Sequence, residues 1–149
     1  MTYNTTKSNK GEGVGGIMIR VGKKYSLDEV FSKLPDFIKE GQWDIRLKEK
    51  ADFDGDKIKV TSQRLQTFYI KGTKCVCCGL EGSYFVKEKS VPHENYHFNL
   101  YGVNDKGEEV LFTKDHIVPK SKGGLNRLEN YQTMCTICNE NKGNLIEGE

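Results

Sequence analysis

Four of the five cysteines form two pairs with identical spacing, and this spacing is typical of metal-binding thiolates. Cys75 and Cys78 make the first pair, and Cys135 and Cys138 make the second, each with two residues between. Two such turns far apart in a sequence can supply a tetrahedral set of thiolates, which suits Zn²⁺. We therefore predict one structural zinc ion held by these four side chains, with Cys77 as a free thiol. Because four thiolates saturate zinc, this ion would do no chemistry itself.

A second group of polar residues lies between and beside the cysteine pairs. The run DHIVPKSKGG starts with adjacent Asp115 and His116, and its proline and paired glycines predict a loop after them. Between Lys114 and Arg127 there are four cations and one anion. This local excess suits a polyanionic partner, although a solvated loop would show the same charge. The net charge of the whole chain, +2, indicates no such partner by itself.

Together with the two cysteine pairs, the segments DHIVPKSKGG, ENYQ and CNENKGN resemble those of the HNH endonucleases, in particular small proteins of this family from phages and bacteria. The resemblance covers residues 72–144, and the letters of the family name fall on His116, Asn130 and Asn139. The third position is often His in the family and is Asn here. The resemblance implies a ββα-metal (His-Me finger) core, in which a hairpin, a loop and a helix grip one divalent cation.

The resemblance also implies roles for individual residues in hydrolysing a DNA phosphodiester bond. His116 would be the general base that takes a proton from the attacking water. Asp115 and Asn139 would bind the catalytic ion, Mg²⁺ or Mn²⁺, since hard oxygen ligands match these ions. Asn130 would orient His116 or brace the loop. Flanking phosphates would be held by three cations, Lys120, Lys122 and Arg127.

The segment HENYH, from His93 to His97, has the spelling of a zinc-protease helix. Such a site needs both histidines on one face of a helix, together with a third ligand. The following residues FNLY favour a strand, in which positions i and i+4 lie far apart. No third ligand remains once His116 is assigned elsewhere. We therefore interpret the match as accidental and expect His93 and His97 to be loop and hairpin residues.

The elements that would position these residues are both helical and extended, so the predicted fold class is α+β. A helix is expected over Ser26–Gly41, capped by Ser26 and kinked or split at Pro35. A shorter helix is expected over Ser62–Tyr69, and DFDGD between them is interpreted as a turn. The aromatic and β-branched segments 83–88, 95–102 and 108–114 predict strands, the last two forming an antiparallel hairpin from Tyr96 to Thr113. From Leu125 onward, LNRLENYQTMC and then CNENKGN predict helix again.

We expect three parts: a flexible Gly-rich tail (1–17), a small, mainly helical region of unknown role (18–71) and the HNH nuclease domain (72–149). No apolar run has the length of a membrane span, and the N-terminus lacks the apolar segment of a secretory signal. The expected location is therefore the cytoplasm, and the resemblance implies a bacterium or a phage-infected cell, with DNA as the partner. One such site cuts one strand, so cleavage of both strands would need a homodimer or two successive nicks. The alternative function is a non-catalytic zinc module that binds nucleic acid or protein.

Overall fold

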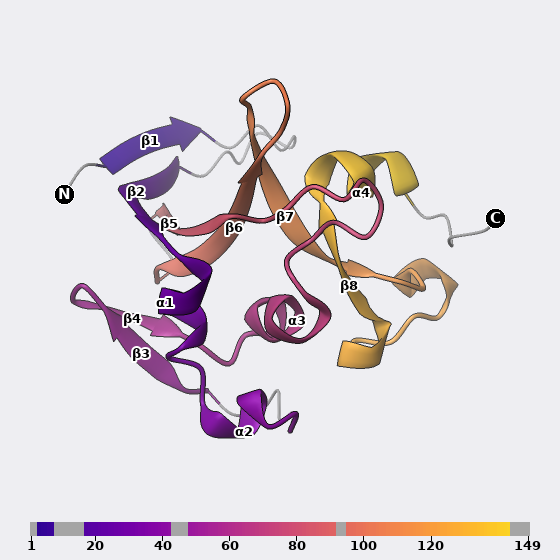
Figure 1. Ribbon diagram of the computed structural model, residues 1–149, viewed down its shortest axis with the longest axis horizontal. Coiled ribbons are helices and arrows are strands. Elements are labelled where there is room, and N and C mark those ends of the chain that lie inside the picture. The colour runs from indigo at the N-terminus through magenta and orange to yellow at the C-terminus, as the bar shows by residue number, and fades with distance from the viewer. Residues whose placement is uncertain (1–2, 8–16, 43–47, 92–94, 144–149) are drawn as a thin grey trace.

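An antiparallel sheet with strand order β1-β2-β5-β6-β7-β8 organises the computed structural model, which describes residues 3–7, 17–42, 48–91 and 95–143 (Figure 1). Its strands are β1 (Tyr3–Lys7), β2 (Ile17–Tyr25), β5 (Tyr84–Val91), β6 (His97–Val103), β7 (Glu109–His116) and β8 (Tyr131–Cys135). A separate hairpin consists of β3 (Lys50–Phe53) and β4 (Asp56–Lys59). The helices are α1 (Leu27–Phe31), α2 (Asp36–Lys39), α3 (Gln63–Lys71) and α4 (Thr136–Lys142), with 3-10 turns η1 (Lys120–Lys122) and η2 (Leu128–Asn130).

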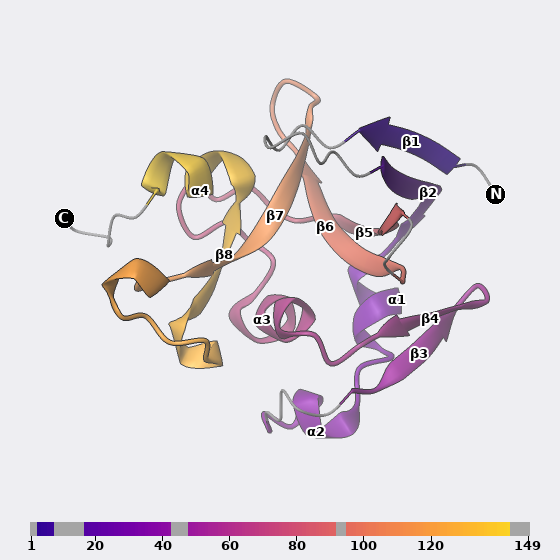
Figure 2. The ribbon, with the colours of Figure 1, turned by 180° about the vertical axis from the view of Figure 1, so that it is seen from behind.

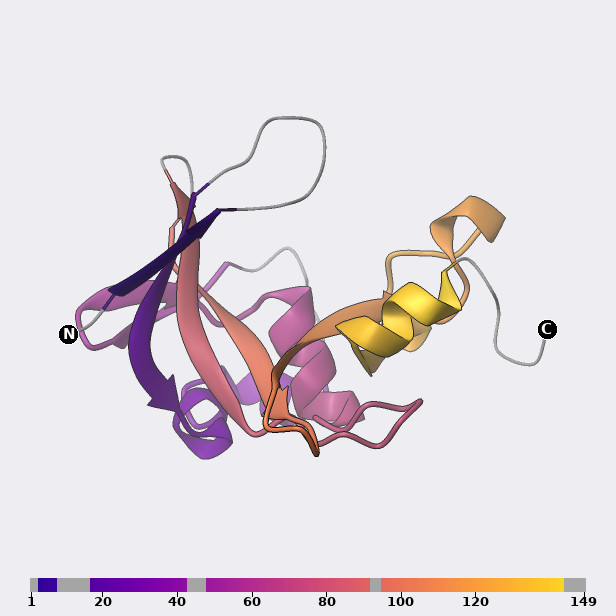
Figure 3. The same ribbon diagram turned by 90° about the horizontal axis from the view of Figure 1, so that it is seen from above.

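The views from the front and from behind show the same distribution of elements around helix α3 (Figures 1 and 2). The β3–β4 hairpin, α1 and α2 lie toward the N-terminal strands, whereas β8 and α4 lie at the opposite end. Seen from above, β8, its preceding loop and α4 extend away from the N-terminal strands (Figure 3). Helix α3 contacts both β7 and β8.

Strand β7 changes partner along its length, and this change creates the site described below. Its first residues pair with β6 in the predicted hairpin, which is confirmed, and that ladder ends at the pair Tyr101 and Leu111. From Phe112 to His116 it pairs instead with β8, in register from Cys135 to Tyr131. The two strands and the helix that follows, β7, β8 and α4, form a ββα unit.

The expectation of a mainly helical N-terminal region is wrong. The helix expected over Ser26–Gly41 exists as two short helices on either side of Pro35, and Ser26 makes the predicted capping box with Glu29. The predicted short helix is confirmed as α3, but β1 to β4 are strands. At the predicted turn DFDGD, Asp54 and Gly55 have φ angles of 54° and 93°. Two positive φ values form the two-residue turn that joins antiparallel strands, so this segment closes a hairpin.

Part of the segment predicted as a flexible tail is a strand in the structure. Tyr3–Lys7 form β1 and pair with Val21–Ile17 of β2. The helix predicted over LNRLENYQTMC is wrong: its first part is loop and η2, and its last five residues are β8. Apolar residues three positions apart in this segment imitate a helical face. The segment forms a strand because pairing with β7 satisfies the backbone hydrogen-bonding groups of Tyr131–Cys135. The same pairing buries Tyr131, Thr133 and Cys135.

One hydrophobic core runs through the described residues on both sides of the predicted boundary at residue 72. Phe85, Phe98 and Phe112 project from three neighbouring strands and are at most 2% exposed. They belong to the same cluster as Val30 of α1 and Phe68 of α3. The N-terminal elements are therefore packed on the same sheet that carries β7. Among the described helices, none is long and apolar enough to cross a membrane.

Candidate functional site

The four predicted zinc ligands come together at the end of β8. Cys75 and Cys78 lie in the turn after α3, Cys135 ends β8, and Cys138 lies in the first turn of α4. Their sulfur atoms all lie within 4.8 Å of one another, and those of Cys78 and Cys135 are 3.9 Å apart. Thiolates about 2.3 Å from a tetrahedral zinc would be separated by about 3.8 Å. The cluster therefore suggests a structural zinc site, and the exposed Cys77 is not part of it.

The protonation of these thiols also fits a bound cation. Burial acts to raise the pKa of Cys75, but the backbone N–H groups of Cys78, Cys135 and Cys77 outweigh it and lower the pKa to about 7. Burial raises the pKa of Cys135 and Cys138. Four thiolates in this space at neutral pH therefore require the positive charge of a metal ion, whose binding releases their protons.

Asp115, His116 and Asn139 surround a single cleft of about 310 Å³, to which Lys120 and Lys142 also contribute. The first two residues end strand β7, and Asn139 follows Cys138 in helix α4. Contact of α4 with β7 thus brings together residues that are more than twenty positions apart in the sequence. The cysteine cluster lies at the start of α4, and its member Cys138 directly precedes Asn139.

The oxygen atoms of Asp115 and Asn139 are oriented by their hydrogen bonds. The amide nitrogen of Asn139 donates to Oγ1 of Thr113 at 2.9 Å, and this hydroxyl donates to the carbonyl of Met134 at 2.9 Å. Asn139 therefore keeps its amide oxygen for another partner. The Asp115 carboxyl group, which is 7% exposed, accepts from Gln132 at 2.9 Å and lies 3.2 Å from the Lys142 ammonium. Both contacts are made by Oδ2. Within the described part of the chain, Oδ1 has no such contact and could bind a cation.

The imidazole of His116 is held by a residue that the sequence did not indicate. Its Nε2 lies 2.8 Å from Oδ1 of Asn126, ten residues later in the loop. An amide oxygen can only accept, so this contact requires the proton on Nε2 and leaves Nδ1 as the basic nitrogen. The ring of Tyr131, the residue paired with His116 across the sheet, meets the imidazole edge to face at 5.1 Å.

Asn130 braces the loop and does not contact the imidazole of His116. Its side chain accepts from the backbone N–H of Val118 at 2.8 Å and donates to the carbonyls of Val118 and Leu125 at 3.0 and 2.9 Å. Its own backbone carbonyl accepts from Ile117 at 2.8 Å. Of the two roles expected for this residue, the structure shows the loop contacts. These hydrogen bonds hold the loop in the conformation in which Asn126 contacts His116.

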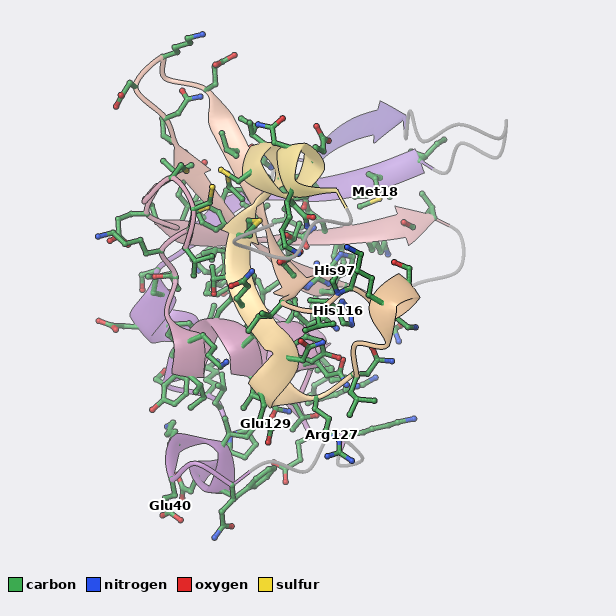
Figure 4. All side chains as sticks on the ribbon, turned by 90° about the vertical axis from the view of Figure 1, so that its right-hand side faces the viewer. Met18, Glu40, His97, His116, Arg127 and Glu129 are labelled. Carbon is green, nitrogen blue, oxygen red and sulfur yellow. The ribbon has the colours of Figure 1, made fainter. Side chains whose placement is uncertain are left out.

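The three predicted phosphate-binding cations do not all reach the cleft. Lys120 lines it, and Lys122 is exposed two residues later on turn η1. Arg127 borders a neighbouring pocket with Asn130 on the other side of the loop. Figure 4 shows Arg127 and Glu129 near the start of β8, away from His116. Only Lys120 therefore lies beside the Asp115–His116 pair, and the roles of all three stay predictions.

Sequence reasoning missed four residues that orient the site. They are Thr113, Asn126, Gln132 and Lys142, which contact Asn139, His116, Asp115 and Asp115 respectively. Lys142 also donates to the backbone carbonyl of His116 at 2.9 Å. The alternation of side chains along paired strands could have indicated Thr113 and Gln132. Thr113 lies two residues before Asp115 on the same face of β7, and Gln132 is the residue of β8 that pairs with Asp115. No local signal distinguishes Asn126 from the other polar loop residues.

The HENYH segment does not form a helix in its described part. His97 is the first residue of strand β6, as expected, whereas His93 and Glu94 lie outside the described residues. Nε2 of His97 lies 3.4 Å from the amide nitrogen of Asn99. Within the ranges that the structure describes, the four cysteines are the only group of three or more potential metal ligands that lie together. His97 is not part of such a group.

Comparison with protein families matches residues 103–149 to a model described as HNH endonuclease. The matched segment contains β7, β8 and α4, and with them Asp115, His116, Asn130 and Asn139. It includes one of the two cysteine pairs, so Cys75 and Cys78 complete the cluster from outside it. Comparisons with curated proteins and with solved structures give no match. By this match and by its ββα unit, the segment of residues 103–149 is an HNH endonuclease domain.

Proposed function

We propose that this protein is a metal-dependent HNH endonuclease that hydrolyses phosphodiester bonds of DNA, nicking or cutting double-stranded DNA. The observation that carries the proposal is the convergence of Asp115, His116 and Asn139 on one cleft within the segment that matches the HNH endonuclease model. A base and two hard oxygen ligands in one cleft are what such hydrolysis requires. The proposed ββα-metal core comprises β7, β8 and α4.

Asp115 and Asn139 fit a single Mg²⁺ or Mn²⁺ ion. The carboxylate and amide oxygens are hard donors, and a site with few protein ligands leaves coordination positions for water and phosphate. When bound, the ion would offset negative charge on the phosphate and the leaving oxygen. Thr113 and Gln132 position the two ligands through the hydrogen bonds described above. Lys142 adds a positive charge beside Asp115.

His116 is the proposed general base. With the proton on Nε2 held toward Asn126, Nδ1 can take the proton of a water molecule as it attacks the phosphorus atom. Asn130 supports this arrangement by holding the loop that carries Asn126. Lys120, Lys122 and Arg127 are the proposed contacts to flanking phosphates, which would position the strand without reading its sequence.

The zinc is proposed as a structural element that fixes α4 against β7, so that Asn139 faces Asp115. A reducing cytoplasm, in a bacterium or a phage-infected cell, would keep its thiolates available for the metal. One site of this kind cuts one strand. Cleavage of both strands would need a homodimer or two successive reactions.

Supercoiled plasmid is the substrate that tests the function. The zinc-loaded protein is incubated with it in the presence and absence of Mg²⁺, beside the variant His116→Ala. We expect nicked or linear plasmid only with Mg²⁺, and none from the variant. If no DNA form is cut with Mg²⁺ or Mn²⁺, the nuclease proposal is wrong. A mobility shift without cleavage would then favour the alternative, a non-catalytic zinc module.

A further inference from the structure

A second concave surface lies where β7 turns away from β6, and we call it the β7 groove. It has a volume of about 520 Å³ and is lined on one side by residues 111–114 of β7. The other side is formed by Lys59 at the end of β4 and by residues 61–64, which lead into α3. One wall thus belongs to the HNH segment, whereas the other belongs to the N-terminal region whose role the sequence left open.

The charges of the β7 groove are all of one sign. Lys59, Arg64 and Lys114 line it, and none of its nine lining residues is acidic. Lys114 therefore shares the groove with two further cations, and a bound phosphate would relieve the repulsion between these like charges.

The groove continues into the proposed active site through Lys114, which lines both the groove and the cleft of Asp115 and His116. The Lys114 ammonium donates to Oε1 of Gln63 at 2.8 Å and lies 4.3 Å from the centre of the Tyr131 ring. The hydroxyl of Tyr131 donates to the same oxygen of Gln63 at 2.9 Å. The start of α3 is therefore fastened directly to the residue that packs against His116.

The length of this surface fits a run of phosphates better than a single one. From Leu111 to His116 a strand advances by roughly 17 Å, at about 3.3 Å per residue. One DNA strand advances by about 3.4 Å per nucleotide along the helix axis. Because the strand also winds around that axis, its successive phosphates lie farther apart than this rise, and the distance spans a few phosphates. An open groove that is lined by cations and continues into the cleft can therefore bind a DNA backbone over several phosphates, the last of them beside His116.

We propose that the β7 groove binds the sugar-phosphate backbone of the DNA strand that is cut, beside the scissile phosphate. The N-terminal region would then be half of the DNA-binding surface, with Lys59 and Arg64 as its phosphate contacts. This inference rests on the proposed action of the protein on DNA. It adds contacts made by β4 and α3, which lie outside the HNH segment.

The test measures binding without catalysis, using the zinc-loaded full chain in the absence of Mg²⁺. Fluorescence anisotropy of a labelled DNA duplex is recorded over a series of salt concentrations for wild type, Lys59→Glu and the double variant Lys59→Ala/Lys114→Met. Lys57→Glu is the matched control, because Lys57 is an exposed lysine of the same strand β4 that does not line the groove. Circular dichroism verifies that each variant is folded, and Lys59 is itself exposed.

We expect the double variant to bind several-fold more weakly. The negative slope of log K against log salt should become smaller in magnitude by about 2, which is about 1 for each lost phosphate contact. Lys59→Glu should reduce the magnitude of the slope by about 1, and Lys57→Glu should leave it unchanged. Equal slopes in wild type and both groove variants would overturn the inference. Tighter, lysine-dependent binding of an RNA duplex of the same sequence would also overturn it, because the groove would then be an RNA site.

Plasmid nicking by the same preparations separates this inference from the proposed function. If wild type nicks with Mg²⁺ and the groove variants bind like wild type, the function stands and the groove inference is wrong. If binding depends on Lys59 and Lys114 but no metal supports cleavage, the groove does bind DNA, but the nuclease proposal is wrong, and with it the assignment of the groove to a strand that is cut. If wild type neither binds nor cuts DNA, both are wrong.

Discussion

At His116, a single hydrogen bond decides which ring nitrogen can act as a base. The partner is Asn126, an exposed residue of the loop between β7 and β8. A side chain that fixes a tautomer acts on catalysis without touching the substrate, as a positioning residue. At Asn139, Thr113 has the corresponding task, because it holds the amide nitrogen and so keeps the amide oxygen for another partner. Both residues can be tested by variants that keep the fold.

Asn126→Ala should slow Mg²⁺-dependent nicking by roughly tenfold to a hundredfold, since the imidazole of His116 loses the acceptor that orients it. The melting temperature should change little, because Asn126 is exposed. Nicking rates and thermal melts check both statements. Asn126→Asp keeps an acceptor oxygen and should recover most of the rate. An Asn126→Ala protein as fast as wild type would contradict the positioning role.

Thr113→Val should raise the Mg²⁺ concentration needed for half-maximal nicking by roughly tenfold or more, because Asn139 loses the oxygen that anchors its amide nitrogen. Loss of hydrogen bonds should also lower the free energy of unfolding by about 1 kcal/mol. Thr133→Val is the matched control. Thr133 donates to the carbonyl of Gly72, away from the cleft. It should destabilise the protein similarly without changing the Mg²⁺ requirement, and an identical Mg²⁺ shift in both variants would refute the argument.

At the scale of elements, α4 and the loop before β8 are short segments held by specific anchors. Helix α4 has seven residues, too few to be stable by itself in water. The cysteine cluster at its start and the contact of Lys142 with the His116 carbonyl at its end fasten it to the sheet. The loop between β7 and β8 depends on Asn130 and on the close approach of Gly124 to Val118.

Removal of zinc should therefore abolish nicking and loosen α4. Cys138→Ser removes one of the four clustered thiols, and a metal analysis should show zinc well below one equivalent. Its helical circular dichroism and melting temperature should fall, since structural zinc contributes to folding directly. Cys77→Ser should retain zinc, stability and nicking, because Cys77 lies outside the cluster. Loss of zinc from Cys77→Ser would show that the ligand set is assigned incorrectly.

Gly124→Ala should open the loop and abolish nicking. A Cβ atom at this position would lie 1.7 Å from the backbone carbonyl oxygen of Val118, so the loop must move away from Asn130. The expected loss of stability is about 1–3 kcal/mol. Gly107→Ala, in the β6–β7 turn, meets no atom within 4 Å and has a φ of +78°. Its strain of about 1–2 kcal/mol should leave nicking unchanged. Equal nicking by the two variants would contradict the role of the loop.

At the scale of the whole molecule, the N-terminal region and the HNH segment share one core and one sheet. The β3–β4 hairpin is joined to β5 by Lys87, whose fully buried side chain contacts Asp56 at 2.6 Å and the carbonyl of Phe53 at 2.9 Å. This hairpin ends at Lys59, which lines the β7 groove. A change in the attachment of the hairpin should therefore affect both stability and the binding of DNA.

Asp56→Ala should lower the free energy of unfolding by about 3 kcal/mol, because it leaves the buried ammonium of Lys87 without its counter-charge. Denaturant unfolding measures this value. The matched control is Asp52→Ala in the same hairpin. Asp52 lies 4.0 Å from Lys57, and both side chains are more than half exposed, so its loss should cost less than about 1 kcal/mol. Comparable losses of unfolding free energy in the two variants would argue that the buried ammonium of Lys87 does not depend on Asp56.

Features that depend on local spacing could be predicted from the sequence. The zinc cluster followed from two CxxC turns, and the group Asp115, His116 and Asn139 followed from the motif that they share. Helix α3, the split at Pro35 and the β6–β7 hairpin also follow local rules, namely capping, the missing proline N–H and alternation of side chains. The signals for the helix, the split and the hairpin each lie within a few residues of the element that they predict.

The tertiary structure decided what depends on partners distant in the sequence. Strand β8 forms because β7 lies beside it to accept its hydrogen bonds, although its apolar spacing suggested a helix. Strands β1 and β2 likewise exist through pairing with each other and with β5. Asn126 reaches His116 because the Asn130 side chain donates a hydrogen bond to the carbonyl of Leu125, the residue before Asn126. The sequence by itself indicated which residues are candidates for the chemistry. Long-range pairing and packing determined which of them meet and which residues orient them.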